Sequence, residues 1–197
     1  MPRGRLYALA WVFYLFLALG GAIWIGWRLG HIPLEQFVDP AAWWVDLALG
    51  LGAGVALLGV WAGLRKLLPR ARELEERLAE LLGPLDPGEA VSLALISGFS
   101  EELFFRGAVQ GSIPGVGGFV LALIVFTLLH TGPGRAFRLW TAFAALAGAA
   151  LGGLMMWRGN LLAPVVAHVL VNAVNLRRLA GAAARTGAPA GDAAARE

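Results

Sequence analysis

Six polar residues lie in otherwise apolar stretches, at spacings that a reaction could use. They are Glu101, Glu102, Arg106, His130, His168 and Asn172. An ionised side chain near the centre of a bilayer costs about 2.5–3.5 kcal/mol on insertion scales, and such residues usually mark function. Glu102 and Arg106 are four residues apart, as are His168 and Asn172, so each pair shares one face of a helix. Glu101 points about 100° away from Glu102 and is free to address another helix.

This set of side chains suits hydrolysis. A carboxylate and a histidine can polarise one water molecule as a general base, and a histidine with an amide donor can stabilise an oxyanion. Alternatively, Glu101, His130 and His168 could hold a zinc ion, or another divalent metal, that activates the water. No serine sits in a Gly-x-Ser-x-Gly setting and no His-Glu-x-x-His pair occurs, so the usual serine and zinc protease motifs are missing. Both remaining routes end with water attacking a carbonyl.

The composition indicates a membrane protein. Of the 197 residues, 58% are apolar and only 15% are charged, against about 25% charged in an ordinary globular chain. This argues against a soluble enzyme, a nucleic-acid-binding protein and a disordered chain. The chain has no cysteine, which excludes disulfides, thiolate metal ligands and a cysteine nucleophile.

The hydropathy pattern predicts an all-α, polytopic transmembrane bundle with about six spans. A spanning helix needs about 20 mostly apolar residues, although some of the segments here are shorter. The expected spans cover residues 6–27, 43–64, 89–110, 119–130, 138–157 and 161–176. Leucines at steps of three and four in residues 65–83 predict one amphipathic cytoplasmic helix, which Pro84 and Pro87 close. The chain thus divides into two N-terminal spans (1–64), a charged linker helix (65–88), a membrane core (89–178) and a tail expected to be disordered (179–197).

The basic residues predict the orientation. With the N-terminus in the cytoplasm, 13 of the 16 Lys and Arg residues fall on the inner side, and only Arg28, Arg106 and Arg158 are left over. The positive-inside rule therefore favours both termini in the cytoplasm. The expected location is a membrane, the bacterial inner membrane, with the bilayer itself as one partner.

The polar residues are expected to meet in one layer. At a rise of about 1.5 Å per residue, Glu101 lies roughly 15 Å below the outer turn and His130 on the order of 18 Å. His168 and Asn172 fall at about 12 and 18 Å by the same measure. Polar side chains from three helices therefore reach one level near the middle of the bilayer.

Each of these residues also has a structural interpretation. Glu102 and Arg106 could be only an ion pair, and His168 with Asn172 could join two helices by hydrogen bonds, worth about 0.6 kcal/mol on average. His130 at a helix end could be a cap. Asp46 is interpreted as an interfacial residue. It is the joint arrangement, rather than any single residue, that favours function.

Three ordered motifs resemble the CPBP family of intramembrane proteases, which includes the CAAX prenyl endopeptidases and Abi-like bacteriocin-processing or immunity proteins. The motifs are Glu-Glu-x-x-x-Arg at 101–106, Phe-x-x-x-His at 126–130 and His-x-x-x-Asn at 168–172. Each pattern is weak alone, but the ordered trio on apolar helices is specific. The resemblance covers about residues 89–178.

The resemblance implies an all-helical bundle with a water-activating pair, here Glu101 and His130. It implies that His168 and Asn172 stabilise the oxyanion, and that Glu102 and Arg106 orient the site. The implied activity is an intramembrane endopeptidase that cleaves a membrane-associated protein or peptide, lipidated in part of the family. We favour a glutamic-type, metal-free reaction over a metalloprotease.

A second function is kept beside the protease. The protein could be a non-catalytic membrane immunity or scaffold protein that binds a partner without cleaving it. A transporter with proton-relay carboxylates is weaker, because no paired hydropathy repeat or pair of broken helices is visible.

Overall fold

The structure is a computed structural model that describes residues 3–83 and 85–186, and these residues form helices and connections but no strand. The elements are α1 (Arg3–Leu29), η1 (Leu34–Gln36), α2 (Trp43–Leu67), α3 (Pro69–Leu82), α4 (Pro87–Glu102), η2 (Leu103–Gln110), α5 (Val116–Leu129), α6 (Gly134–Arg158) and α7 (Leu162–Thr186). Of these, η1 is a short 3₁₀ turn and η2 is a π-helical continuation of α4. The predicted all-α fold is confirmed.

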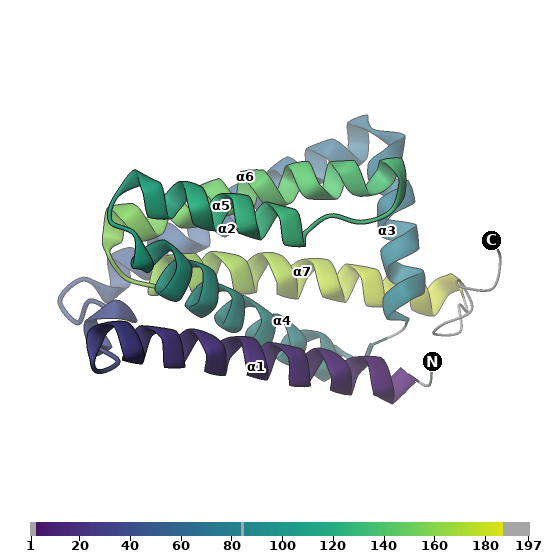
Figure 1. Cartoon of the computed structure of the whole chain (residues 1–197). Coiled ribbons are helices and arrows are strands. Elements are labelled where there is room, and N and C mark those ends of the chain that lie inside the picture. Colours follow the sequence, from purple (N-terminus) through teal and green to yellow (C-terminus); the bar gives the residue numbers. More distant parts are fainter. Residues whose placement is uncertain (1–2, 84, 187–197) are drawn as a thin grey trace.

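The helices are arranged around α7, which runs through the middle of the bundle (Figure 1). α2, α4, α6 and α3 all pack against it, α5 packs on α6 and on η2, and α1 lies along α4. The short helix α3 stands across the end of the bundle where α1 begins and α7 ends. Any residue on the inner face of α7 therefore faces several other helices at once.

Among the described residues, three helices are long and apolar enough to cross a membrane: Leu6–Leu29 within α1, α2 and α6. The other three expected spans also lie within helical segments. α5 is apolar but has only 14 residues, about 21 Å of helix. The remaining two, α4 with η2 and α7, carry five of the six polar residues that were singled out from the sequence, and His130 follows α5.

The predicted amphipathic helix begins later than expected. Residues 65–67 continue α2, and the chain breaks at Leu68, whose backbone is extended (φ −119°, ψ 115°). Pro69 explains the break, because proline disfavours the α conformation in the residue before it and fits the first position of a new helix. α3 then buries Ala71 and Leu74 against α2 and α6, beside Trp61 and Phe143.

The expectation of a disordered tail is wrong for residues 179–186. The prediction placed it from residue 179, but α7 continues to Thr186, and Leu179 and Ala183 pack against Ala79 of α3. The alanine-rich composition had suggested disorder. Alanine is a strong helix former, however, and burial of one face of the helix stabilises it. The rest of the predicted tail, residues 187–197, lies outside the described residues.

Candidate active site

The site begins where α4 and α7 approach closely. A Cβ atom added to Gly98 of α4 would lie 2.7–3.2 Å from three atoms of Val169 on α7, so only glycine permits this approach. One turn further along α4, Glu102 meets His168 of α7, and His168 Nδ1 lies 2.6 Å from Glu102 Oε1. Because a carboxylate accepts hydrogen bonds, His168 donates from Nδ1 and turns Nε2 toward the interior of the site.

Glu102 is held by a second partner, Arg106, as its spacing predicts. Arg106 Nη1 donates to Glu102 Oε1 over 2.9 Å, and both side chains are almost fully buried. Arg106 also donates from Nη2 to the carbonyl of Gly148 on α6 and lies 4.4 Å from the ring centre of Phe126 on α5. The arginine therefore neutralises Glu102 and ties η2 to two other helices.

His130 ends α5 and is oriented by its own helix. Its Nδ1 lies 2.7 Å from the carbonyl oxygen of Phe126, and its ring lies against the Phe126 ring at 4.2 Å between centres. Thr141 of α6 donates to the backbone carbonyl of His130. Because a carbonyl can only accept, the proton sits on Nδ1, and in the neutral ring Nε2 carries a lone pair.

Glu101 faces both histidines. Its Oε2 atom lies 3.8 Å from Nε2 of His130 and 3.8 Å from Nε2 of His168. These separations are too long for direct hydrogen bonds, and a polar gap of that length suits a bridging molecule such as water. Oε2 is buried, and no donor among the described residues reaches it. The site therefore brings one carboxylate oxygen and two imidazole nitrogens to one point.

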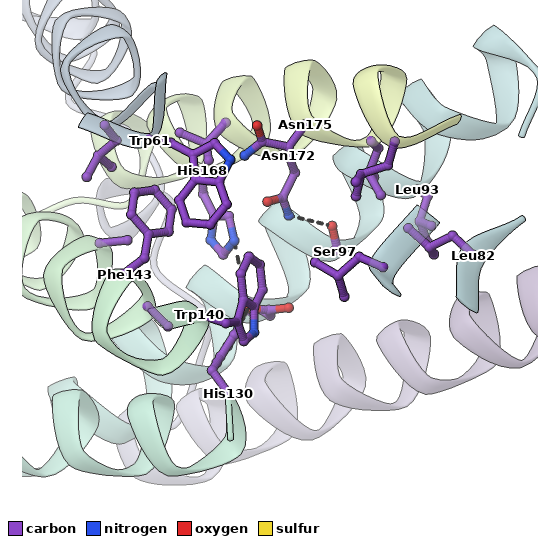
Figure 2. A pocket seen from close by; sticks show the side chains of 18 of the residues that line it. Trp61, Leu82, Leu93, Ser97, His130, Trp140, Phe143, His168, Asn172 and Asn175 are labelled. Atoms are coloured by element: carbon purple, nitrogen blue, oxygen red, sulfur yellow. Dashed lines mark hydrogen bonds and ion pairs between the residues drawn. The ribbon is translucent and has the colours of Figure 1, made fainter. Parts of the chain in front are cut away.

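A cavity of about 540 Å³ opens beside this point. Figure 2 shows Asn172 and Ser97 pointing at one another in it, joined by a 2.9 Å hydrogen bond from the asparagine amide. His130 and His168 line one part of the cavity, and Leu82 and Leu93 line another. Most other lining residues are apolar, and they come from all seven α-helices.

A zinc ion held by Glu101, His130 and His168 is the alternative that the sequence leaves open. Their nitrogen and oxygen atoms are donors that zinc accepts. However, the described residues contain no group of three or more His, Cys, Asp or Glu side chains in an arrangement that could hold a metal ion. We therefore derive no step through a metal.

All six site residues expected from the sequence gather at this place. Glu101, Glu102, Arg106, His130 and His168 form one connected cluster, and Asn172 lies beside it on the wall of the cavity. The Glu102–Arg106 pair is a buried ion pair, and Glu102 also accepts the hydrogen bond that orients His168.

Two further cavity residues were missed in the sequence. Tyr14 of α1 interacts with Glu101 and lines the cavity. Asn175 of α7 also lines it, and its buried Oδ1 atom has no partner among the described residues. Asn175 could have been found, because it continues the face of His168 and Asn172 at position i+7. Tyr14 gave no signal, since a tyrosine in an apolar span is unremarkable.

Asp46 is a correction to the sequence prediction. It was expected at the interface, but its side chain is fully buried. Arg158 at the end of α6 donates to Asp46 Oδ1, and Asn160 donates to Oδ2 over 2.8 Å. Asn160 in turn accepts from the backbone N–H of Leu162, where α7 begins. These hydrogen bonds fix the loop between α6 and α7 against α2.

Comparison with known proteins agrees with the motifs. Residues 85–174 match the family described as type II CAAX prenyl endopeptidase Rce1-like. The uncharacterized protein YpbD of Bacillus subtilis (strain 168) is 34% identical over 86 residues, which are 43% of this chain and 42% of that protein. The chain thus matches less than half the length of this relative. No solved structure matches the chain. The matched segment holds all six predicted site residues, but not Tyr14 or Asp46.

Proposed function

We propose that the protein is an intramembrane endopeptidase, because residues 85–174 match the family described as type II CAAX prenyl endopeptidase Rce1-like. It hydrolyses a peptide bond in a membrane-associated protein or peptide. One observation carries the proposal: a buried glutamate oxygen without a donor faces the Nε2 atoms of two histidines, at 3.8 Å each.

Glu101 and His130 activate the water. In the neutral His130 ring Nε2 accepts a proton, because Nδ1–H is already bound to the Phe126 carbonyl. A water molecule between this nitrogen and Glu101 has two strong acceptors for its hydrogen atoms. As its oxygen attacks the substrate carbonyl carbon, one O–H bond breaks and the proton passes to Glu101. This is general-base catalysis by a carboxylate.

His168 and Asn172 stabilise the charge that forms on the carbonyl oxygen. With Glu101 and Glu102 ionised and Arg106 positive, the buried cluster has a net charge of −1, so a proton on His168 makes it neutral. The Glu102 carboxylate at 2.6 Å supports that imidazolium. His168 Nε2–H and the second amide hydrogen of Asn172 then serve as oxyanion donors.

The proton taken from the water is returned to the leaving group. When the tetrahedral intermediate collapses, the C–N bond breaks and the electron pair remains on nitrogen. Glu101 returns the proton to that nitrogen, giving a free amine and a new carboxyl terminus. No other reactant is required besides water.

The cavity suits an apolar substrate segment. Its apolar lining and its volume of about 540 Å³ fit several side chains of an extended peptide, or a lipid chain attached to one. Ser97, Asn172 and Asn175 are the polar groups available to a peptide backbone. The proposed substrate is therefore a membrane-associated, in some cases lipidated, protein or peptide.

The proposed orientation puts both termini in the cytoplasm of a bacterial cell, with the protein in the inner membrane. The start of α1, helix α3, the start of α6 and the end of α7 lie at one end of the bundle (Figure 1). These segments carry most of the basic residues that the positive-inside rule assigns to the cytoplasm.

The test is the Glu101→Gln variant. New peptide termini are mapped in membranes that contain the wild type, this variant, or the control Glu76→Gln, which alters an exposed glutamate of α3. Termini that appear with the wild type and the control, but not with Glu101→Gln, support the protease. Cleavage that persists in Glu101→Gln contradicts the mechanism.

Two further arms separate the alternatives. If a chelator removes activity and added zinc restores it, the water is metal-bound, whereas indifference to chelators supports the glutamate reaction. If Glu101→Gln, His130→Ala and Asn172→Ala all leave the biological phenotype intact, the protein is a non-catalytic immunity or scaffold factor instead.

A further inference from the structure

A second hollow lies on the outside of the bundle, away from the proposed active site. It has a volume of about 690 Å³ and is more open than the central cavity. Three arginines line it together with small and apolar residues from the α2–α3 junction and the first turns of α6. The lining residues are Leu68, Pro69, Arg70, Arg135, Arg138, Leu139 and Ala142. Segments about 65 residues apart in the chain thus bring three positive charges to one place.

These three arginines have no carboxylate partner among the described residues, unlike Arg65 and Arg77 nearby. On the same helix, Arg77 pairs with Glu73, and Arg65 at the end of α2 pairs with Glu75. Among the described residues, none of the ion pairs includes Arg70, Arg135 or Arg138. Three like charges around one hollow repel one another unless an anion lies between them.

The backbone adds to the positive potential. α3 begins at Pro69 and α6 begins at Gly134, so both helices start beside the hollow. The N-terminal end of a helix carries about half a positive charge from its unpaired N–H groups. Both the side chains and the helix ends therefore favour a compact group with several negative oxygen atoms, and phosphate is the group that such sites bind best.

The surroundings of the hollow indicate where that phosphate comes from. Leu67 and Leu68, beside Pro69, are 79% and 39% exposed, and Leu139 and Ala142 form part of the wall. A free phosphate ion makes no favourable contact with this apolar surface. A phospholipid does, because its acyl chains lie next to its headgroup. Basic hollows between membrane helices on the cytoplasmic side are typical sites for anionic headgroups.

We propose that the hollow between α3 and α6 binds the headgroup of an anionic phospholipid through Arg70, Arg135 and Arg138. The bound headgroup bridges α3 to α6. Trp140 and Thr141, in the same turns of α6, contact His130, so the headgroup also fixes the helix that supports this histidine.

Binding is measured on the purified full chain in phosphatidylcholine nanodiscs with increasing phosphatidylglycerol. The readouts are the midpoint of thermal unfolding and the number of retained lipids in native mass spectra. A ligand that binds the folded state raises the midpoint in proportion to the logarithm of its concentration. Neither readout depends on proteolysis, so failure here and failure of the proposed protease are distinguishable.

The test variant replaces Arg70, Arg135 and Arg138 with Gln. Its matched control replaces Arg72, Arg177 and Arg178, which are also exposed and unpaired among the described residues and do not line the hollow. Both variants lose three charges, so non-specific attraction falls equally. With about fivefold in affinity from each of the three arginines, the hollow variant should bind phosphatidylglycerol about 100-fold more weakly than the control.

Two results overturn the proposal. If the hollow variant and the control lose the same amount of phosphatidylglycerol binding, the three arginines act only as surface charge. If inorganic phosphate in a neutral detergent produces the whole thermal shift without any lipid, the ligand is the free ion and not a headgroup.

Discussion

Two buried polar clusters join the helices of this bundle, one around Asp46 and one around Glu101. In the first, both oxygens of Asp46 accept hydrogen bonds, from Arg158 and Asn160, and Asn160 is itself satisfied by the backbone of α7. In the second, Glu101 Oε2 has no donor among the described residues, although two histidine nitrogens face it. One cluster is closed and the other is open.

The difference separates a structural group from a reactive one. A buried polar atom without a partner costs free energy, and beside two histidine nitrogens such an atom suits a bound water or a reacting group. Both clusters contain an acid and an arginine, and composition alone does not distinguish them. They differ in whether the oxygen atoms of the acid at the centre all accept hydrogen bonds.

The largest effect is expected at the open cluster. His130→Ala should lower the turnover number by a factor of about 10²–10⁴, because it removes one of the two acceptors for the attacking water. The thermal unfolding midpoint should change little. His31→Ala, at an exposed loop histidine, is the control. Cleavage rates come from the termini-mapping assay. If His130→Ala lowers the unfolding midpoint strongly as well as the turnover number, His130 has a structural role, and the distinction between the two clusters fails.

Asp46→Leu should do the opposite. It leaves the buried amide of Asn160 and the guanidinium of Arg158 without their acceptor, so we expect the unfolding midpoint to fall by about 5–10 °C. The turnover number per folded molecule should stay within a factor of about two. Circular dichroism in detergent gives the unfolding midpoint, and the termini-mapping assay gives the turnover number. A selective loss of turnover would mean that the closed cluster belongs to the active site.

Tyr14→Phe tests whether the open cluster extends to α1, which lies outside the matched residues 85–174. Loss of a hydrogen-bonding group next to a carboxylate should reduce the turnover number about tenfold. The substrate KM should stay near its wild-type value, because Glu101 is mispositioned while the cavity keeps its shape. Tyr7→Phe removes the α1 hydroxyl that bonds Ser92, and serves as the control. Equal turnover in the two variants would remove Tyr14 from the site.

The smallest effect is expected for Ser97→Ala. Ser97 accepts a hydrogen bond from Asn172 and donates one to the backbone of α4. Interhelical bonds of this kind are worth about 0.6 kcal/mol, so turnover should fall about threefold through loss of the Asn172 orientation. Ser92→Ala is the matched control on the same helix. An effect as large as that of His130→Ala would give Ser97 a direct role in the reaction.

The open cluster could be predicted from the sequence because its information is local. Helical spacing placed Glu102 with Arg106, and counting from the turns put His130 and His168 at similar depths. The misplacement of these charges in apolar helices marked them as unusual before any contact was known. All six of the predicted site residues also lie within the matched residues 85–174.

The closed cluster could not be predicted in this way. Asp46 and Arg158 are 112 residues apart, and each alone looks like an ordinary charge near the end of a span. Tyr14 was missed for the same reason, since its contact with Glu101 arises only when α1 packs along α4. The continuation of α7 to Thr186 depends on burial against α3, which composition does not record.

The π-helical segment Leu103–Gln110 has a consequence for how this sequence can vary in length. Each residue of an α-helix turns the chain by about 100°, so a segment with a wider turn resets the phase of all that follows. Arg106 and Gln110 donate to the carbonyls of Gly148 and Gly152 in that phase. A point substitution on the lipid side of the segment would leave the phase intact. The loss of a single codon between 103 and 105 would change the phase at which Arg106 and Gln110 meet α6.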